Sequence, residues 1–312
     1  MTAFVVVNPR SGGGRTARGW SEIERALSAV YPHMAIAFTR KRCDATVLVR
    51  NALNEGHQEI VAIGGDGTIN EAVNGFFDGD GPIAPDAVLA FVTSGTGGDF
   101  RKSFAIEAGP AAAIARLKNA GIRAIDVGRV ACLTAHGEPT VRHFINIASF
   151  GLSGRIVESV NRARIAKLFG GSFAFAFHST AAMLRHKNLP IRILVDGRED
   201  VIATISTVAI ANGQFFGGGM KVAPDARPDD GLFDVVIIGG APRGQSLAKM
   251  QLIYSGAHVR EPHVQVIRGR RVMVAPVAET RGRPVLIETD GESAGRLPAT
   301  FEILPRALNL RC

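Results

Sequence analysis

Three glycine-rich loops in the first hundred residues each follow a short apolar run, and this repetition most constrains the fold. Short runs rich in Val and Ile between turn residues are typical of buried strands. Glycine after a strand allows tight turns and close backbone approach. The apolar run Phe4–Val7 precedes the loop Ser11–Gly14. In the same way Glu59–Ile63 precedes Gly64–Thr68, and Val88–Val92 precedes Ser94–Asp99.

Segments with helical character alternate with these strands. We expect another strand at Met34–Thr39 and helices from about Thr16, at Asp44–Glu55 with Asp44 as its cap, at Ile69–Phe77 and at Pro110–Ala120. Alternating strands and helices indicate a parallel sheet. Ligands of such sheets bind beyond the carboxyl ends of the strands, so we expect the glycine-rich loops to converge on one cleft.

The pattern changes after residue 122. Closely spaced strand-like runs separated by turns predict a mainly antiparallel β domain, interrupted by a long helical stretch at about 154–187. We therefore expect an α/β nucleotide-binding domain over 1–122 and a β domain over 123–304. The expected strands are Ala124–Ala131, Arg142–Ala148, Ile191–Val195, Val201–Asn212, Leu232–Ile238, Val264–Arg268, Arg271–Ala275, Val285–Glu288 and Thr300–Leu304.

Composition agrees with two ordinary globular domains: 312 residues, of which 46% are apolar and 21% charged. Cys43, Cys132 and Cys312 are far apart and form no metal-binding or disulfide pattern, which favours a reducing, cytoplasmic location. The start has no export signal, and no stretch approaches the roughly 20 apolar residues of a membrane span. We expect neither export nor membrane insertion.

The net charge of +8 indicates an anionic partner such as a nucleotide, a nucleic acid or an acidic lipid, although solubility alone would explain it. One Trp and two Tyr provide no aromatic platform for single-stranded nucleic acid, so nucleic acid is the least favoured partner.

Two of the glycine-rich loops allow a structural and a functional interpretation. Asn8–Arg15 could wrap an anion with backbone N–H groups and offset its charge with arginines, or could be a tight turn. Asp66, between glycines at a strand end, could bind Mg²⁺, accept a hydroxyl proton or cap the next helix.

Two acidic segments in the second half are equally open. Asp290-Gly291-Glu292 could direct two carboxylates at one centre, as a metal ligand and a general base, or could be a plain hairpin turn. The loop Pro224–Leu232 could hold a hard cation or be solvated. No hydrolase triad is present, and the apolar residues Phe173, Phe175, Phe177 and Met183 indicate core packing or a lipid-facing wall.

Taken together, these motifs resemble the diacylglycerol kinase catalytic-domain family, which contains bacterial lipid kinases and is related to sphingosine kinases. The resemblance covers nearly the whole chain in order, whereas G-G-D-G alone is shared with NAD kinases and phosphofructokinases. The motifs are N-P-x-S-G-G-G, G-G-D-G-T-I-N-E, S-G-T-G-G-D-F, F-G-L-S-G-R, V-A-P-D-A-R-P-D-D-G-L-F-D-V and D-G-E.

The resemblance implies an ATP- and Mg²⁺-dependent kinase that phosphorylates a lipid hydroxyl, foremost diacylglycerol. It implies an α/β nucleotide-binding domain, a β-sandwich domain, a ligand cleft between them, and a C-terminal tail at about 305–312 that returns to the first domain. The positions matching ATP contacts are Asn8, Pro9, Arg10, Ser11, Gly12, Thr39, Gly65, Asp66, Gly67, Thr68, Ile69, Asn70, Glu71 and Thr96.

The same resemblance implies roles for the acids. Asp66, Asp126 and Asp290 match the acidic set around the catalytic magnesium, and Glu292 matches the base that takes the lipid hydroxyl's proton. A second, structural magnesium matches the carbonyls of Arg227 and Leu232 and the carboxylate of Asp230.

Three positions depart from the family pattern: Gly98 replaces an Asn, Lys102 replaces an Ala, and Ser153 replaces an Asp of many relatives. They leave open a nucleotide- or lipid-binding regulator with weakened catalysis, beside a soluble-substrate kinase of the NAD kinase type. For a lipid kinase we expect peripheral contact with anionic membranes. The sequence leaves the oligomeric state open, a homodimer included.

Overall fold

The computed structural model describes residues 2–79, 81–94, 98–104, 106, 109–154, 188–240, 250–277 and 284–312. The helical stretch expected at about 154–187 lies outside the described residues, apart from its first residue. So do Phe173, Phe175, Phe177, Met183 and Thr96. Among the described residues, no helix is long and apolar enough to span a membrane.

The chain divides into two compact units. Unit 1 comprises Met1–Val127 and Pro305–Cys312, and unit 2 comprises Gly128–Leu304. Two strands run from one unit into the other: β7 (Ile122–Leu133) and β16 (Glu292–Arg311). Unit 1 is therefore built from both ends of the chain.

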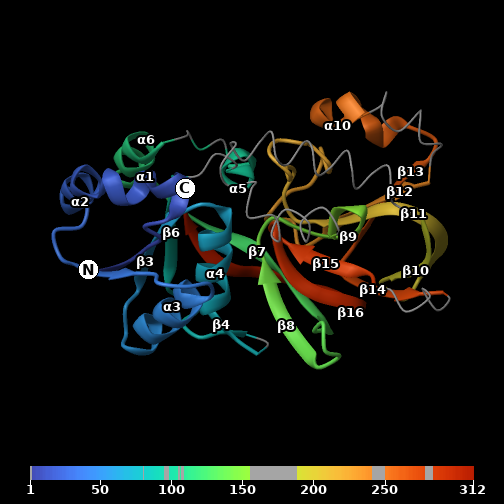
Figure 1. Cartoon of the computed structure of the whole chain (residues 1–312), viewed down its shortest axis with the longest axis horizontal. Helices are drawn as coiled ribbons and strands as arrows, with labels where there is room; N and C mark the ends of the chain where they lie inside the picture. Colours follow the sequence, from blue (N-terminus) through green and yellow to red (C-terminus); the bar gives the residue numbers. More distant parts are fainter. Residues whose placement is uncertain are drawn as a thin grey trace. The chain divides into compact units, whose positions relative to one another are not determined.

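Unit 1 contains a parallel sheet in the order β2–β1–β3–β6 (Figure 1). The end of β16 adds to it, also in parallel, with Asn309 opposite Val88. The strands β3 and β6 are buried along their whole length, as expected for central strands of a parallel sheet. The bounds are β1 (Ala3–Val7), β2 (Met34–Phe38), β3 (Glu59–Gly64) and β6 (Val88–Thr93).

Helices cover both faces of this sheet (Figure 1). On one face, Ile23 and Leu27 of α2 and Ile114 and Leu117 of α6 pack against β1, β3 and β6. The helices α3 and α4 pack against each other and against β1 and β3. The helices are α1 (Ser11–Arg18), α2 (Trp20–Ser28), α3 (Asp44–Asn54), α4 (Asp66–Gly75), α5 (Asp99–Ser103) and α6 (Pro110–Leu117), and a small hairpin joins β4 (Phe77–Asp78) to β5 (Gly81–Pro82).

The expected order of strands and helices is confirmed, but one cap is wrong. The carboxylate of Asp44 accepts the N–H groups of Arg40 and Lys41 at 2.7 and 3.0 Å, so it folds back over the preceding turn. The residue before α3 is Cys43, in a left-handed conformation. These backbone N–H groups hold the pKa of Asp44 below its usual value.

Unit 2 is a mainly antiparallel β structure, as expected. Strand pairing runs through β9, β15, β16, β14, β10 and β11 and returns to β9. β11 changes partners near an irregularity between Ile205 and Thr207, where a strand can turn from one sheet layer into another. The strands are β8 (Pro139–Phe144), β9 (Ile147–Gly151), β10 (Leu189–Val195), β11 (Glu199–Ala211), β12 (Phe233–Gly239), β13 (Val264–Gly269), β14 (Arg271–Pro276) and β15 (Leu286–Thr289), with short helices α10 (Met250–Ser255) and η2 (Ala257–Arg260).

Two strand predictions differ from the structure. The single strand expected at Arg142–Ala148 is two strands, β8 and β9, separated by Ile145 and Asn146. The strand expected at Thr300–Leu304 is part of β16, which begins at Glu292. Both differences arise because strand ends depend on distant pairing partners, which a local apolar pattern does not contain.

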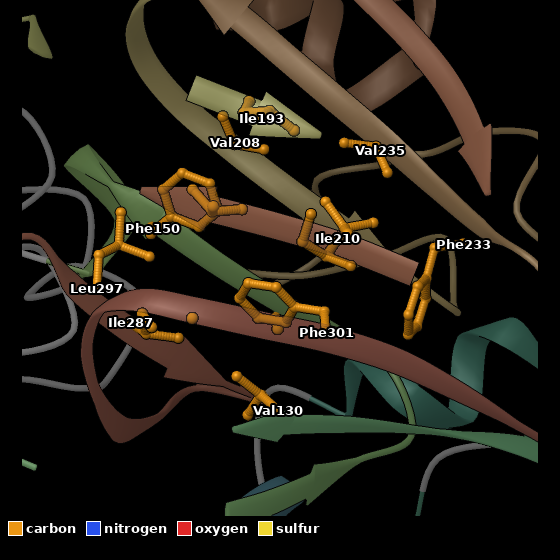
Figure 2. Close-up of a cluster of buried hydrophobic side chains, with 14 of the residues drawn as sticks. Val130, Phe150, Ile193, Val208, Ile210, Phe233, Val235, Ile287, Leu297 and Phe301 are labelled. Carbon is orange, nitrogen blue, oxygen red and sulfur yellow. The ribbon is translucent and has the colours of Figure 1, made fainter. Parts of the chain in front are cut away.

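The inward faces of the unit 2 strands form one hydrophobic core (Figure 2). Phe150 and Phe301 stack with ring centroids 6.2 Å apart, and Phe144 stacks on Phe233 at 5.7 Å. Ile287 of β15 belongs to the same core. The hairpin that carries Asp290 and Glu292 is therefore anchored at its base by apolar packing.

The C-terminal tail is fixed to unit 1 by a buried ion pair. Arg311 donates from Nε and Nη2 to the Glu59 carboxylate at 2.6 and 2.8 Å. Tyr31 donates its hydroxyl proton to Glu59 at 2.7 Å. Glu59 is only 2% exposed, so its charge depends on this guanidinium.

Loss of Arg311 should destabilise the protein. We expect Arg311→Ala to lower the free energy of unfolding by about 3 kcal/mol, because Glu59 would stay buried without its cation. Urea denaturation measures the change. Arg192→Ala is the matched control, since the Arg192–Asp200 pair has side chains 58% and 39% exposed and should contribute much less. Equal losses in the two variants would contradict this role for Glu59.

Candidate active site

The ends of four parallel strands in unit 1 place the predicted nucleotide loops at one edge. Val7 lies opposite both Phe38 and Ile63, and Gly64 lies opposite Thr93. The residues that leave these strands therefore start at the same edge of the sheet, as the alternation of strands and helices predicts.

Side-chain hydroxyls join the first loop to the third. Ser11 Oγ lies 2.6 Å from both Thr16 Oγ1 and Ser94 Oγ, and Thr16 Oγ1 donates to Ser94 Oγ at 2.7 Å. Thr16 is buried. This hydroxyl cluster, made of Ser11, Thr16 and Ser94, holds the two loops together.

Asn8 joins the first loop to the second. Its Nδ2 donates to Thr68 Oγ1 at 3.0 Å, and its Oδ1 accepts the N–H of Arg10 at 3.0 Å. Both polar ends of the amide are thus used to set the positions of two loops. The role of Asn8 shown here is to order the loops.

Two glycines permit these contacts by their lack of a side chain. A Cβ on Gly12 would lie 2.4 Å from the Ser94 carbonyl oxygen, and φ at Gly12 is +59°. A Cβ on Gly64 would lie 2.4 Å from Thr68 Oγ1. A side chain at Gly12 would push the first loop away from the third, and one at Gly64 would displace the Thr68 side chain that accepts the Asn8 hydrogen bond.

Asp66 is the first residue of α4 and is half-buried. Its Oδ2 accepts the backbone N–H of Asp99, at 3.3 Å, from the loop after β6. Gly98 precedes this N–H in a left-handed conformation, with φ at 59°. Asp66 is therefore not the helix cap considered above, because the capping position belongs to Gly65.

Four other predicted nucleotide residues lie near these loops with different surroundings. Glu71 uses both carboxylate oxygens to accept the N–H groups of Cys43 and Ala45, at 2.8 and 3.2 Å. The side chain of Ile69 is buried in the core, whereas Thr39 and Gly67 are half-buried. Glu71 thus fixes the start of α3.

Asp126 of β7 is the other unit 1 acid predicted to lie around the catalytic magnesium, and it is fully buried. Its Oδ1 accepts the N–H of Arg306 at 2.8 Å. Arg306 belongs to the C-terminal tail, so this bond joins β7 to the end of the chain. Asp66 is therefore hydrogen-bonded to one of the nucleotide loops, whereas Asp126 is hydrogen-bonded to the C-terminal tail.

In unit 2, Asp290 and Gly291 form a two-residue hairpin turn with positive φ at both residues, 50° and 83°. The Asp290 carboxylate accepts three consecutive backbone N–H groups: Ile145 at 3.1 Å, Asn146 at 3.1 Å and Ile147 at 3.0 Å. The hairpin interpretation is therefore correct locally, and its carboxylate ties the tip to the turn between β8 and β9.

Glu288 lies beneath this tip and is buried. Its Oε2 accepts the N–H of Gly291 at 2.8 Å, and its Oε1 is hydrogen-bonded to Ser149 Oγ. Burial, assisted by the negative charges of Asp290 and Glu292, raises the pKa of Glu288 to about 7 against the hydrogen bonds from Ser149 and Gly291.

A chain of hydroxyl groups continues from Glu288. Ser149 Oγ lies 2.7 Å from Ser153 Oγ, which lies 2.9 Å from Thr207 Oγ1, and Thr207 donates to the Phe150 carbonyl at 3.0 Å. Through these hydroxyl groups Glu288 is connected to Thr207 of β11.

Glu292 follows this turn as the first residue of β16, opposite Thr289. It is half-buried. The two preceding residues set the position of its backbone. Asp290 is held through its own carboxylate, and the N–H of Gly291 is held by the carboxylate of Glu288.

The loop expected to bind a structural magnesium contains a contact with an arginine. Asp230 accepts the N–H of Leu232 at 3.1 Å through Oδ1, and its Oδ2 is bonded to Nη2 of Arg268. Arg268 Nε also donates to the buried Asp234 at 3.0 Å. Burial raises the pKa of Asp234, while Arg268 acts to lower it.

Comparison with known proteins gives two family matches along the chain. Residues 2–130 match the diacylglycerol kinase catalytic domain, and residues 146–312 match the YegS C-terminal NAD kinase beta sandwich-like domain. The chain belongs to the diacylglycerol kinase catalytic-domain family. It is a kinase, and its two units correspond to the α/β and β-sandwich parts that the resemblance implied.

Relatives of this kinase match it over most of their length. A diacylglycerol kinase of Staphylococcus carnosus is 27% identical over 96% of this chain and 91% of its own. One from Mycobacterium tuberculosis is 27% identical, over 86% and 81%. One from Staphylococcus aureus is 28% identical, over 99% and 91%.

Solved structures show the same fold. A diacylglycerol kinase from Bacillus anthracis superposes with a TM-score of 0.71 at 19% identity, covering 99% of this chain and 96% of that one. Yeast NADH kinase in complex with NADH gives a TM-score of 0.51 at 12% identity, covering 99% and 82%.

Two of the acids predicted to bind magnesium are engaged by protein groups. Both oxygens of Asp230 are engaged by a guanidinium and an N–H group, and Asp290 is bound by three N–H groups. Among the described residues, no three carboxylate, histidine or cysteine side chains gather closely enough to hold a metal. No step below depends on a metal held by the protein alone.

Sequence reasoning missed Glu288, Ser149 and Arg268. Glu288 had a detectable signal, since it is an acid within a run that otherwise reads as a buried strand. Ser149 and Arg268 had none, because their roles depend on strand pairing across 139 and 38 residues of sequence.

Stability should depend on pH through Glu288. The folded state favours its protonated form, so Glu288 stabilises the fold below its ordinary pKa of 4.5, and this contribution declines as pH rises through about 7. We expect the free energy of unfolding of the wild type, relative to Glu288→Gln, to fall by about 3 kcal/mol over this range. Denaturant titrations at several pH values measure it, and a difference independent of pH would contradict the assignment.

Arg268 should make the Asp230 loop independent of magnesium. Without nucleotide, we expect EDTA to leave the wild-type Tm unchanged, because the guanidinium already holds the acids. In Arg268→Ala, Tm should fall, and added Mg²⁺ should raise it more than in the wild type. Thermal unfolding monitored by fluorescence tests both. A Mg²⁺-dependent rise in wild-type Tm that Asp230→Asn abolishes would show that the metal binds here after all.

Proposed function

We propose that this kinase transfers the γ-phosphoryl group of ATP to the hydroxyl group of a lipid, foremost diacylglycerol. The observation that carries the proposal is the pair of family matches, over residues 2–130 and 146–312. The similar curated proteins named diacylglycerol kinase extend along nearly the whole chain.

Nucleotide binding is assigned to the loop edge of unit 1. The described residues of the loops after β1, β3 and β6 are joined through Asn8, Asp66 and the hydroxyl cluster, so these contacts hold the loops together without a ligand. Phosphoryl transfer depends mainly on positioning and on neutralising charge, which ordered glycine-rich loops and basic side chains supply. The exposed cations Arg10, Arg15, Arg40 and Lys41 follow β1 and β2.

ATP is expected to enter with its own Mg²⁺, as the MgATP substrate. The metal would neutralise the phosphate charges that develop during transfer. Of the acids predicted to surround it, Asp66 lies at the loop edge, and Asp66 is our candidate for contact with the substrate's metal.

Proton removal from the lipid hydroxyl is assigned to Glu292. It is half-buried and follows a turn held by two carboxylates, so a general base there would be kept in a defined position. The net charge of +8 suits a lipid substrate at an anionic membrane surface, where each Lys or Arg contributes roughly 1 kcal/mol.

A soluble acceptor such as NAD is the second candidate. What supports it is the fold likeness to yeast NADH kinase, at a TM-score of 0.51. Such a kinase would act without lipid and would need no hairpin base specific for a lipid hydroxyl.

The proposal is tested by transfer of labelled γ-phosphate from MgATP to diacylglycerol in mixed micelles, with sphingoid bases and NAD as parallel acceptors. We expect labelling of diacylglycerol and a loss of at least 100-fold in kcat for Glu292→Gln, with ATP affinity unchanged. Glu261→Gln, elsewhere in unit 2, is the matched control and should keep full activity. Labelling of NAD alone, or full activity of Glu292→Gln, would overturn the assignment.

A further inference from the structure

The tip of the Glu292 hairpin is held by a second carboxyl group, separate from that of Asp290. Glu288 Oε2 accepts the N–H of Gly291 at 2.8 Å, and Gly291 is the residue directly before Glu292. The side chain of Glu288 therefore fixes the last peptide group before the proposed base.

The other oxygen of Glu288 is held from the neighbouring strand. Glu288 and Ser149 are cross-strand partners of β15 and β9, and Ser149 Oγ bonds to Glu288 Oε1. Ser149 in turn contacts Ser153, and Ser153 contacts Thr207 of β11. The tip is thus connected through side chains to two strands outside its own hairpin.

Hairpin stability alone gives no reason for this arrangement. An Asp-Gly turn with positive φ at both residues forms a stable two-residue hairpin without further help. Ile287 already anchors the base of the hairpin in the apolar core (Figure 2). A buried carboxyl is costly unless satisfied, and an apolar residue at 288 would avoid that cost. The acid therefore needs an explanation other than holding the strands together.

We propose that Glu288 and Ser149 are positioning residues for the phosphoryl-transfer reaction, and that they hold the peptide group of Gly291 so that Glu292 is aimed at the acceptor hydroxyl. This inference rests on the proposed role of Glu292 as general base. Asp290 fixes the first residue of the turn and Glu288 fixes the second, so the backbone entering Glu292 is held on both sides of one peptide bond. A base displaced by about 1 Å loses on the order of 100-fold in rate.

The test compares Glu288→Leu with Glu288→Gln. Leu keeps an apolar side chain in the buried position but removes both acceptors. Gln keeps an oxygen for the Gly291 N–H and offers an NH₂ group to Ser149. We expect kcat to fall at least tenfold in Glu288→Leu, with KM for ATP and for diacylglycerol within twofold of wild type. Glu288→Gln should recover kcat to within threefold.

Ile193→Ala is the control for stability, because it opens a cavity in the same core away from the hairpin (Figure 2). All assays run at least 10 °C below each variant's Tm. A folded Glu288→Leu protein with wild-type kcat overturns the proposal, as does a rise in KM with kcat unchanged. A fall in kcat equal to that of Ile193→Ala also overturns it.

Ser149→Ala gives an independent reading if Glu288→Leu fails to fold. It removes one contact of Glu288 and should lower kcat with KM unchanged, whereas wild-type kcat would overturn the proposal. Failure of the proposed role of Glu292 can be distinguished from failure of the positioning role, because Glu292→Gln would then remain active. An inactive Glu292→Gln together with fully active Glu288 and Ser149 variants would refute the positioning role alone.

Discussion

The candidate site in unit 2 depends on one contact. The Asp290 carboxylate accepts hydrogen bonds from three consecutive backbone N–H groups. Ile145, Asn146 and Ile147 belong to the turn and strand start that separate β8 from β9. Buried N–H groups at such a turn need acceptors, and the two oxygens of one carboxyl group satisfy all three. These hydrogen bonds hold the hairpin tip against the turn between β8 and β9. Glu292 follows Asp290 by two residues.

Unit 1 joins its loops mainly with neutral groups. The loops meet through an amide, three hydroxyls and the carboxylate of Asp66, and Gly12 has no side chain to meet the Ser94 carbonyl oxygen. Loops that bind a highly charged ligand gain from this choice, because neutral donors and acceptors hold the backbone without placing negative charge beside phosphates. Of the two acids at this edge, Asp99 is paired with Lys102 at 2.9 Å, and Asp66 is the one we consider for the metal of MgATP.

The local pattern of apolar and turn residues was sufficient to predict the order of strands and helices. It was not sufficient to predict contacts between residues far apart in the sequence. The alternation of Val-rich runs with helices predicted β1, β3 and β6 and the helices between them. The break between β8 and β9 was missed, because Ile145 and Asn146 leave the strand only to meet Asp290, 144 residues away from Asn146. Asp44 was taken for a cap because its spacing suits one, yet its carboxylate satisfies N–H groups on the preceding turn instead. Glu288 and Arg268 act through partners that no spacing rule specifies.

Two of the departures from the family pattern, at Gly98 and Ser153, can be related to contacts in the structure. Gly98 stands in a left-handed conformation, which Gly and Asn adopt more readily than other residues, so a change from Asn keeps the turn that delivers the Asp99 N–H to Asp66. Ser153 lacks the acid of many relatives, but it is joined through Ser149 to the carboxyl of Glu288. Ser153 therefore belongs to a hydrogen-bonded chain that contains a carboxyl group, although its own side chain carries none.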